Sequence, residues 1–310
     1  MTNKSFSNST SLFDELDALE AGFFFLETVL FIPTVFGNTL ILICLRKYQW
    51  LRTPLNSLIK NLAAADLLIG VLLIPFDIVG TFFGLNRLRY VCLVQLAILV
   101  SLLLVSLFSM FAISVERYLS VAFPWQHRAT KRHNYVRIFV PICWTISIGF
   151  SIIPLLGIHD FIDGKSRCHL TLVWPQEMRV TLSSIVVIVV ITKITLYSLV
   201  VNIALGKLTN FSEGGDHSRM RRKLAKTYIL IAISAIFIIC WAPYCIVTFF
   251  KIFFDYDELK IAAGWTILLV FINSGLNWLI YGLKNAKIRR AFKMLLCNVG
   301  EDRNSVEMSS

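Results

Sequence analysis

Seven apolar stretches divide this chain of 310 residues, and they constrain its fold more than any other feature. They lie at about 22–46, 55–82, 91–122, 135–158, 179–205, 226–252 and 261–283. Each reaches the roughly 20 residues with which a helix crosses about 30 Å of hydrocarbon. Because lipid offers the backbone no hydrogen-bond partners, such stretches cross it as helices. The sequence therefore predicts an all-α membrane protein with a bundle of seven transmembrane helices.

The composition indicates the same solvent. Apolar residues make up 56% of the chain and charged residues only 16%, with a mean hydropathy of +0.71. A net charge of +11 would suggest nucleic-acid binding in a soluble protein, but here the basic residues form short clusters between the apolar stretches. We therefore expect the lipid bilayer as a partner and no nucleic acid. The seven cysteines form no CxxC pair and no ligand-spaced cluster with His, so we expect no metal site of that kind.

Charged residues between the stretches differ on the two sides of the predicted membrane. The connections after the first, third, fifth and seventh stretches are basic, as in Arg128, Lys131 and Arg132. The opposite connections mix signs, as in Asp160 and Lys165. Because cytoplasmic loops carry the excess of Lys and Arg, we predict an extracellular N-terminus and a cytoplasmic C-terminus.

The chain divides into three parts. Residues 1–21 are polar and acidic and contain sequons at Asn3 and Asn8, which predicts a glycosylated extracellular tail. Residues 22–283 form the seven-helix bundle. Residues 284–310 hold a short amphipathic eighth helix, with apolar and basic residues on opposite faces, and a short cytoplasmic tail. Cys297 follows that helix directly and is a candidate for palmitoylation.

Polar side chains inside the apolar stretches are the first candidates for function, because in lipid each one needs a partner. Asp66 is the strongest, since a carboxylate at mid-membrane needs a cation, a proton or several donors. The hydroxyl and amide groups also fit ordinary hydrogen bonds between helices. They belong to Asn38, Ser106, Asn273, Ser274 and Asn277.

Two further pairs stand at the ends of the third stretch. Glu116 and Arg117 lie near its end, where such residues either serve a function or simply reach the headgroups. Cys92 opens the stretch 25 residues before Arg117, or about 37 Å along a helix, and so lies on the other side of the membrane. Cys168 lies in a connection on that outer side, where disulfides persist. A Cys92–Cys168 bridge would hold this loop over the bundle.

The chain resembles the rhodopsin-like (class A) G-protein-coupled receptors in the order of these residues. The resemblance extends from about Gly37 to Cys297. Each motif is weak alone, but their joint order and spacing are specific. The short tail and loops resemble the adenosine, melanocortin and amine branches without deciding between them. The resemblance is carried by Gly37-Asn38, LAAAD ending at Asp66, Cys92, Glu116-Arg117-Tyr118, Pro124, Trp144, Tyr197, Phe237 with CWAPY, Asn273-Ser274, and Asn277-Trp278-Leu279-Ile280-Tyr281.

The resemblance implies a plasma-membrane receptor that couples an extracellular ligand to a heterotrimeric G protein, and no enzyme. By family analogy Glu116 holds Arg117 at rest. Once released, Arg117 meets the G protein together with Tyr197 and Tyr281, and Tyr118 completes the motif. The resemblance also implies an allosteric sodium ion, and no other cofactor, in a pocket of Asp66, Ser106, Asn273, Ser274 and Asn277. A carboxylate among hydroxyl and amide oxygens suits a small hard cation.

Three positions depart from the family pattern. Trp278 and Val189 each stand where the family usually has a proline, in helices 7 and 5. Lys223 stands where helix 6 often carries an acidic partner for Arg117, and an unusual Lys193 lies within helix 5. These changes weaken the expected inactive state, so we predict elevated basal signalling.

The resemblance also places a ligand pocket. Leu99 replaces the helix-3 Asp that pairs with amines, and Phe271 replaces the Lys of opsins, which disfavours a biogenic amine and a Schiff-base pigment. A small, mostly neutral ligand such as a nucleoside or lipid fits best, while a peptide that contacts the outer loops remains open. The pocket positions are Asp77, Gln95, Leu99, Leu103, Trp241, Tyr244, Thr248 and Ile267.

Two other classes of protein compete with a receptor. A transporter or channel would use Asp66 and Lys193 as a charge pathway, but the chain shows no inverted repeat and carries an intact Glu116-Arg117-Tyr118. A membrane enzyme would need a nucleophile with a base or a metal cluster, and the sequence shows neither.

Overall fold

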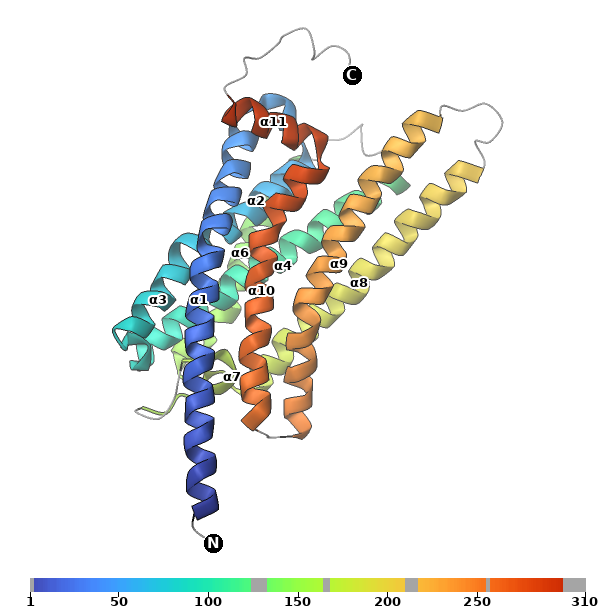
Figure 1. Cartoon of the computed structure of the whole chain (residues 1–310). Coiled ribbons are helices and arrows are strands. Elements are labelled where there is room, and N and C mark those ends of the chain that lie inside the picture. Colours follow the sequence, from blue (N-terminus) through green and yellow to red (C-terminus); the bar gives the residue numbers. More distant parts are fainter. Residues whose placement is uncertain (1–2, 124–132, 164–167, 210–216, 255–256, 298–310) are drawn as a thin grey trace.

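The computed structural model describes residues 3–123, 133–163, 168–209, 217–254 and 257–297 as a bundle of long helices (Figure 1). Helices α2 and α3 form one span, joined by a π-helical turn at Ile69–Leu73. Pro75 follows this turn and has no N–H to donate, so the helical ladder is already interrupted there. The helices are α1 (Asn3–Lys47), α2 (Pro54–Leu68), α3 (Ile74–Phe82), α4 (Arg89–Ala122), α6 (His133–Ser151), α7 (Leu170–Val173), α8 (Gln176–Thr209), α9 (His217–Phe253), α10 (Asp257–Lys284) and α11 (Ala286–Leu296).

The spans match the predicted transmembrane segments. Within the described residues, six helical segments are long and apolar enough to cross a membrane. The seventh is the shorter apolar helix Tyr135–Ser151 of α6, which a 3-10 turn at Ile153–Leu156 extends. The predicted seven-helix membrane bundle is thereby confirmed. Helix α1 begins at Asn3, so the predicted tail continues the first span as helix. The side chains of Asn3 and Asn8 lie outside the described part, and their glycosylation stays a prediction.

Helix α4 forms the centre of the bundle. In the most apolar 18-residue segment of α4, 72% of the residues are buried, compared with 28% for the same segment of α8 and 33% for that of α9. At the end of the bundle where α11 lies, α8 and α9 stand apart from α10 (Figure 1). The interior is therefore packed around α4, while α8 and α9 present most of their surface to the lipid.

Helix α11 is the predicted amphipathic eighth helix. The Asn285 side chain caps it by accepting hydrogen bonds from the backbone N–H groups of Lys287 and Ile288. One face buries Ile288 and Phe292, and the other exposes basic residues. Such a helix lies along a membrane surface rather than crossing it. Cys297, at its C-terminal end, is exposed.

Candidate functional site

Asp66 lies at the centre of a hydrogen-bonded layer that joins three helices. It is fully buried on α2, where each carboxylate oxygen accepts one hydrogen bond. The Ser106 hydroxyl of α4 donates to Oδ1 at 3.0 Å, and the Asn277 amide of α10 donates to Oδ2 at 2.8 Å. The Ser274 hydroxyl is buried on α10, three residues before Asn277, and makes no hydrogen bond among the described residues. The structure thus joins three of the five predicted sodium-pocket residues by hydrogen bonds, and the other two, Asn273 and Ser274, are buried on the same helix as Asn277.

Asn38 extends this layer to α1. Its amide nitrogen donates to the carbonyl of Thr34 at 2.9 Å and to the carbonyl of Ser274 at 3.4 Å. Its side-chain oxygen is buried and has no hydrogen-bond partner among the described residues. One carboxylate, hydroxyl groups and a spare amide oxygen form a donor set that suits a hard cation, so the residues present fit sodium.

The predicted coupling residues meet near the other end of α4. Arg117 interacts electrostatically with the phenol groups of Tyr197 on α8 and Tyr281 on α10. The Ser114 hydroxyl donates to the Tyr197 hydroxyl at 3.2 Å, which fixes the α8 side of this cluster. Tyr118 lies at its edge, with its ring against Phe123 at a centroid distance of 6.4 Å. Three helices therefore converge on one guanidinium group.

Glu116 has a partner on a neighbouring helix that was not predicted from the sequence. It is buried, and its carboxylate accepts a hydrogen bond from the Tyr135 hydroxyl of α6. Across the described ranges, the ion pairs within 4.0 Å do not include one between Glu116 and Arg117. Arg117 therefore lies among the phenol groups of Tyr197 and Tyr281 and the carboxylate of Glu116, all of which interact with it electrostatically. The side chain of Lys223 lies outside the described part.

The predicted ligand positions divide into two groups. Leu99 and Leu103 of α4 are buried, as are Trp241, Tyr244 and Thr248 of α9. The Trp241 indole N–H has no hydrogen-bond partner within the described part of the chain. Ile267 of α10 is partly buried against the same core. This first group combines apolar walls with a few buried polar groups, as small-molecule sites do.

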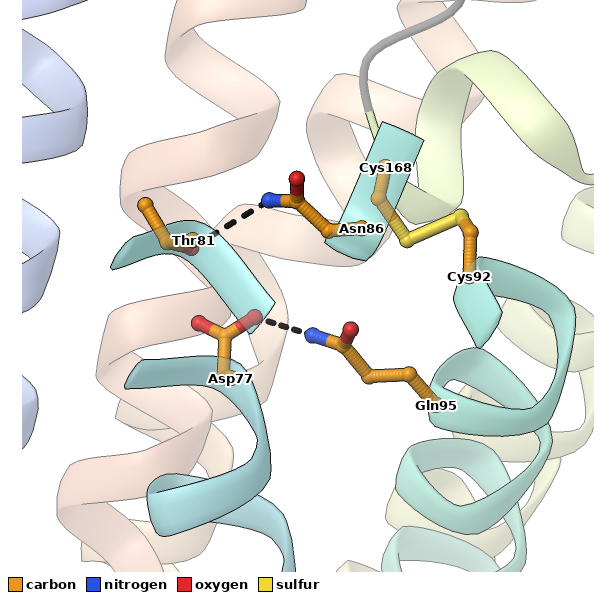
Figure 2. The surroundings of a disulfide bond; sticks show 6 residues. All are labelled: Asp77, Thr81, Asn86, Cys92, Gln95 and Cys168. Atoms are coloured by element: carbon orange, nitrogen blue, oxygen red, sulfur yellow. Dashed lines mark hydrogen bonds between the residues drawn. A yellow bond between two sulfur atoms is a disulfide. The ribbon is translucent and has the colours of Figure 1, made fainter. Parts of the chain in front are cut away.

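The second group gathers near the predicted disulfide, which the structure confirms. Cys92 and Cys168 are bonded, with their Cα atoms 5.5 Å apart (Figure 2). One turn further along α4, the Gln95 amide nitrogen donates to the Asp77 carboxylate of α3. Asp77 and Gln95 therefore meet each other, and the disulfide holds the loop with Cys168 beside them.

Glu27 is a functional candidate that was not predicted from the sequence. It lies on α1 with only 4% of its surface exposed, and its carboxyl group interacts with that of Asp77. The signal was present, because Glu27 is an acidic residue inside the apolar stretch 22–46, just as Asp66 is inside the next one.

Comparison with known proteins identifies the family. Residues 37–281 match the family model described as "7 transmembrane receptor (rhodopsin family)". The chain belongs to this family. It is a G-protein-coupled receptor embedded in a membrane by several spans, and the competing interpretation as a transporter or channel is not favoured.

Similar proteins include receptors with different names. Adenosine receptor A2b of Mus musculus is 27% identical, over 91% of this chain and 92% of the relative. A QRFP-like peptide receptor of Branchiostoma floridae is 26% identical, over 87% and 76%. Somatostatin receptor type 5 of Rattus norvegicus is also 26% identical, over 84% and 74%. These levels of identity leave the ligand of this receptor undecided.

Two of the unusual residues of this receptor take defined places. Trp278 lies against Gly37 of α1 so closely that a Cβ atom on Gly37 would come within 1.9 Å of the indole Cγ. The Phe36 ring meets Trp278 edge-on, at a centroid distance of 6.0 Å. Helix α10 continues through Trp278 to Lys284. Where the family usually has a proline, this G-protein-coupled receptor has a close contact between α1 and α10.

Lys193 of α8 is fully buried in the receptor. Its Nζ atom lies 3.9 Å from the centroid of the Phe237 ring of α9, a cation–π geometry. Within the described ranges it has no hydrogen-bond acceptor. Phe237 in turn packs on Trp241, with ring centroids 5.8 Å apart. The contact between α8 and α9 is therefore built around the Lys193 amino group and two aromatic rings.

Proposed function

We propose that an extracellular ligand binds between α4, α8, α9 and α10, and that the receptor responds by engaging a heterotrimeric G protein at the end that holds Arg117. The observation that carries this proposal is the convergence of Arg117, Tyr197 and Tyr281 from three helices. Cys92 lies 25 residues away on α4, or about 37 Å, so the ligand must act through movement of helices. Trp241 and Phe237 link the ligand positions of α9 to this movement.

The arrangement around Arg117 supports elevated basal signalling. Glu116 accepts a hydrogen bond from Tyr135, and the sequence has Lys223 at the position where the family often has an acidic partner for Arg117. Arg117 already lies with the two tyrosines with which it is expected to meet the G protein. In a receptor with this arrangement, the conformation that couples to the G protein is already populated without ligand.

The proposed ligand is small, largely apolar and not a typical biogenic amine. Leu99 and Leu103 offer apolar contact, and no carboxylate replaces the missing helix-3 Asp at Leu99. Relatives named for adenosine and for peptides both match the chain. A screen of nucleosides, lipids and peptides in cells that report several second messengers would identify the ligand class.

Sodium binding at Asp66 belongs to the same proposal. Asp66, Ser106, Asn273, Ser274 and Asn277 would hold the ion, and a bound cation supplies a positive charge that ties α2, α4 and α10 together. Because the cation binds one packing of these helices better than another, it shifts the population toward that packing. The family analogy assigns this packing to the inactive state.

The same proposal includes the topology and the modifications. We propose a plasma-membrane location, an extracellular N-terminus glycosylated at Asn3 and Asn8, and a cytoplasmic C-terminus palmitoylated at Cys297. The basic connections and the exposure of Cys297 beside α11 support it.

The coupling site is tested by Arg117→Ala in cells without added ligand. The wild-type receptor should signal above mock-transfected cells, and the variant should fall to the mock level at equal surface expression. Arg89→Ala is the matched control, because Arg89 pairs with Asp163 on the exposed surface at the other end of α4. It should keep the basal signal. Undiminished basal signalling by Arg117→Ala would remove this site from the proposal.

A further inference from the structure

Tyr135 contacts the Glu116-Arg117 pair from a neighbouring helix, α6. It lies two residues after the start of α6 at His133, and 37% of its surface is exposed. Its hydroxyl donates a hydrogen bond to the carboxylate of Glu116, which is only 3% exposed. A hydrogen bond to an ionised group is stronger than one between neutral groups. This contact therefore holds the buried Glu116 side chain on the α6 side of α4.

Glu116 and Arg117 point to different sides of α4. Successive residues of an α-helix are about 100° apart around its axis, so adjacent side chains do not face each other. Glu116 is hydrogen-bonded to α6, whereas Arg117 lies toward two tyrosines of α8 and α10. Within the described ranges, the two residues form no ion pair within 4.0 Å. An ion pair would require both side chains to bend toward each other.

Arg117 has a hydrogen-bond donor that the structure leaves unused. Its Nε atom is buried and has no partner in the part of the chain that the structure describes. A guanidinium carries five N–H donors in a planar fork that matches the two oxygens of a carboxylate, and Nε belongs to that fork. Because a buried donor without a partner is costly, the carboxylate of the adjacent Glu116 is an acceptor that would satisfy it.

We propose that Tyr135 is a positioning residue that diverts Glu116 from Arg117 and thereby raises the basal activity of the receptor. Its effect on signalling rests on the proposed function, whereas its effect on the Glu116–Arg117 interaction does not. With the phenol hydroxyl present, Arg117 stays with the tyrosines with which it meets the G protein. Without this hydroxyl, the carboxylate of Glu116 loses a donor and turns to the guanidinium group, which gives the resting ion pair.

The size of the effect follows from one hydrogen bond. Two arrangements of the Glu116 side chain compete, one bonded to Tyr135 and one paired with Arg117. The net contribution of a single hydrogen bond shifts such a two-state equilibrium by about 2- to 10-fold. The basal signal follows the population in which Arg117 is not paired, so it should change by a similar factor.

The first experiment measures basal signalling in cells without ligand, at equal surface expression of each receptor. Tyr135→Phe keeps the ring and removes only the hydroxyl, and it should lower the basal signal about 2- to 10-fold below that of the wild type. Glu116→Gln removes the negative charge that would pair with Arg117, so it should keep or raise the signal. Adding Tyr135→Phe to Glu116→Gln should lower nothing further, because the carboxylate that it releases is absent.

Tyr90→Phe is the matched control. Tyr90 lies near the start of α4, at the other end of the bundle, and is 70% exposed. Loss of its hydroxyl should leave the basal signal unchanged. If Tyr135 merely supported the fold, Tyr135→Phe would reduce the signal with or without Glu116→Gln. The proposed role reduces the signal only where the Glu116 carboxylate is present.

The second experiment measures the Glu116–Arg117 interaction without a G protein. Unfolding temperatures of the purified full-length receptor are compared for Glu116→Gln, Arg117→Ala and the double variant, both with Tyr135 intact and in the Tyr135→Phe background. Each double-mutant cycle gives the coupling between the two residues. The coupling should be larger by about 2–4 °C in the Tyr135→Phe background, because the ion pair forms there.

The outcomes separate the two proposals. Equal coupling in the two backgrounds overturns the inference, and so does a basal signal that Tyr135→Phe leaves unchanged or raises. A wild-type signal at the level of mock-transfected cells would refute the proposed basal activity, while the coupling would still show whether Tyr135 diverts Glu116. Undiminished signalling by Arg117→Ala would refute the coupling site and leave the double-mutant cycles unaffected. Either proposal can therefore fail alone.

Discussion

Two buried ionisable side chains, Asp66 and Lys193, lie in different halves of the bundle and are paired differently. In the first half, the Asp66 layer pairs both carboxylate oxygens, and Trp278 fills the space over Gly37. In the second half, the contact between α8 and α9 buries Lys193 over an aromatic ring, without a hydrogen-bond acceptor among the described residues. We call these the Asp66 half, made of α1, α2, α4 and α10, and the α8–α9 half.

This difference indicates which half moves. Segments that change conformation are drawn from the less stable parts of a protein, where few groups are fully buried and paired. The buried share of the apolar segment is 28% for α8 and 33% for α9, against 39% for α1, 44% for α2 with α3, 50% for α10 and 72% for α4. At the α11 end, α8 and α9 also stand apart from α10 (Figure 1). The Asp66 half therefore serves as a frame, and the α8–α9 half as the part that responds to ligand.

The largest effect is expected at Gly37 in the Asp66 half. A Cβ atom at this position would lie 1.9 Å from the Trp278 Cγ, far inside van der Waals contact. Overpacking commonly costs about 1–3 kcal/mol, and this overlap places Gly37→Ala at or above the upper end. The measurement is the unfolding temperature and surface expression of the receptor.

A second glycine supplies the matched control for Gly37→Ala. A Cβ atom on Gly149 of α6 would meet no atom within 4 Å. Alanine favours a helix interior over glycine by roughly 0.5–1 kcal/mol, so Gly149→Ala should be neutral or slightly stabilising. Trp278→Ala should also relieve part of the Gly37→Ala defect in the double variant. If Gly37→Ala is as stable as Gly149→Ala, the frame is not held by this contact.

Asp66→Asn should have the next largest effect. The new amide can accept from Asn277 only through its oxygen, and its NH₂ group then requires the Ser106 hydroxyl to change from donor to acceptor. Both hydrogen bonds also lose the charge of the carboxylate, so we expect a loss of about 1–3 kcal/mol. We also expect sodium, compared with N-methyl-D-glucamine, to raise the unfolding temperature of the wild type and not that of the variant.

The reciprocal exchange tests whether geometry or charge matters at Asp66. Asp66→Asn with Asn277→Asp keeps one carboxylate and one amide in the same layer, and it should recover part of the stability. A wild-type unfolding temperature that is equal in the two salts would refute the sodium site and leave the hydrogen-bonded layer intact.

Lys193→Met should change stability in the opposite direction. Methionine keeps the length of the side chain and removes a buried ammonium that has no acceptor within the described residues. We expect a gain of about 1–3 kcal/mol in the free energy of unfolding, since an unsatisfied buried polar group costs this much. A loss similar to that of Asp66→Asn would show that Lys193 has a partner and that the two halves are alike.

The sequence predicted the spans because their signal is local. Twenty apolar residues form a helix in lipid whatever their neighbours are. A carboxylate within such a span, such as Asp66, is recognisable from the sequence alone as a candidate for function. The partners of that carboxylate were predicted through the family resemblance, which supplies the rotation of each helix. The Cys92–Cys168 bridge was predicted because both residues fall on one side of the membrane.

Other contacts could not be predicted, because they depend on how the helices tilt and rotate against each other. The sequence shows Trp278 in place of a proline but not that Gly37 receives the indole. It shows Glu116 beside Arg117, but the Tyr135 hydroxyl that binds Glu116 comes from another helix. Glu27 likewise gains meaning only from its contact with Asp77.

The smallest effect separates two serines that the sequence alone makes look alike. The Ser106 hydroxyl donates to Asp66 at 3.0 Å in the Asp66 half. The Ser183 hydroxyl of α8 is fully buried and has no partner in the part of the chain that the structure describes, while its carbonyl lies 4.0 Å from the Cys245 sulfur of α9. Ser106→Ala should cost about 1 kcal/mol or more, because it removes a hydrogen bond to a carboxylate.

Ser183→Ala should instead be neutral or stabilising by up to about 1 kcal/mol, because a buried hydroxyl without a partner contributes only its desolvation cost. Both substitutions remove one oxygen atom, so the cavity term is nearly the same and the comparison isolates the hydrogen bond. Unfolding temperatures of the two variants, measured in one detergent without ligand, give the result. Equal losses would mean that the α8–α9 half is satisfied like the frame. A gain for Ser183→Ala would indicate that the Ser183 hydroxyl of the wild type has no partner and can hydrogen-bond to a ligand. Ser183 lies on α8, in the half that we expect to move.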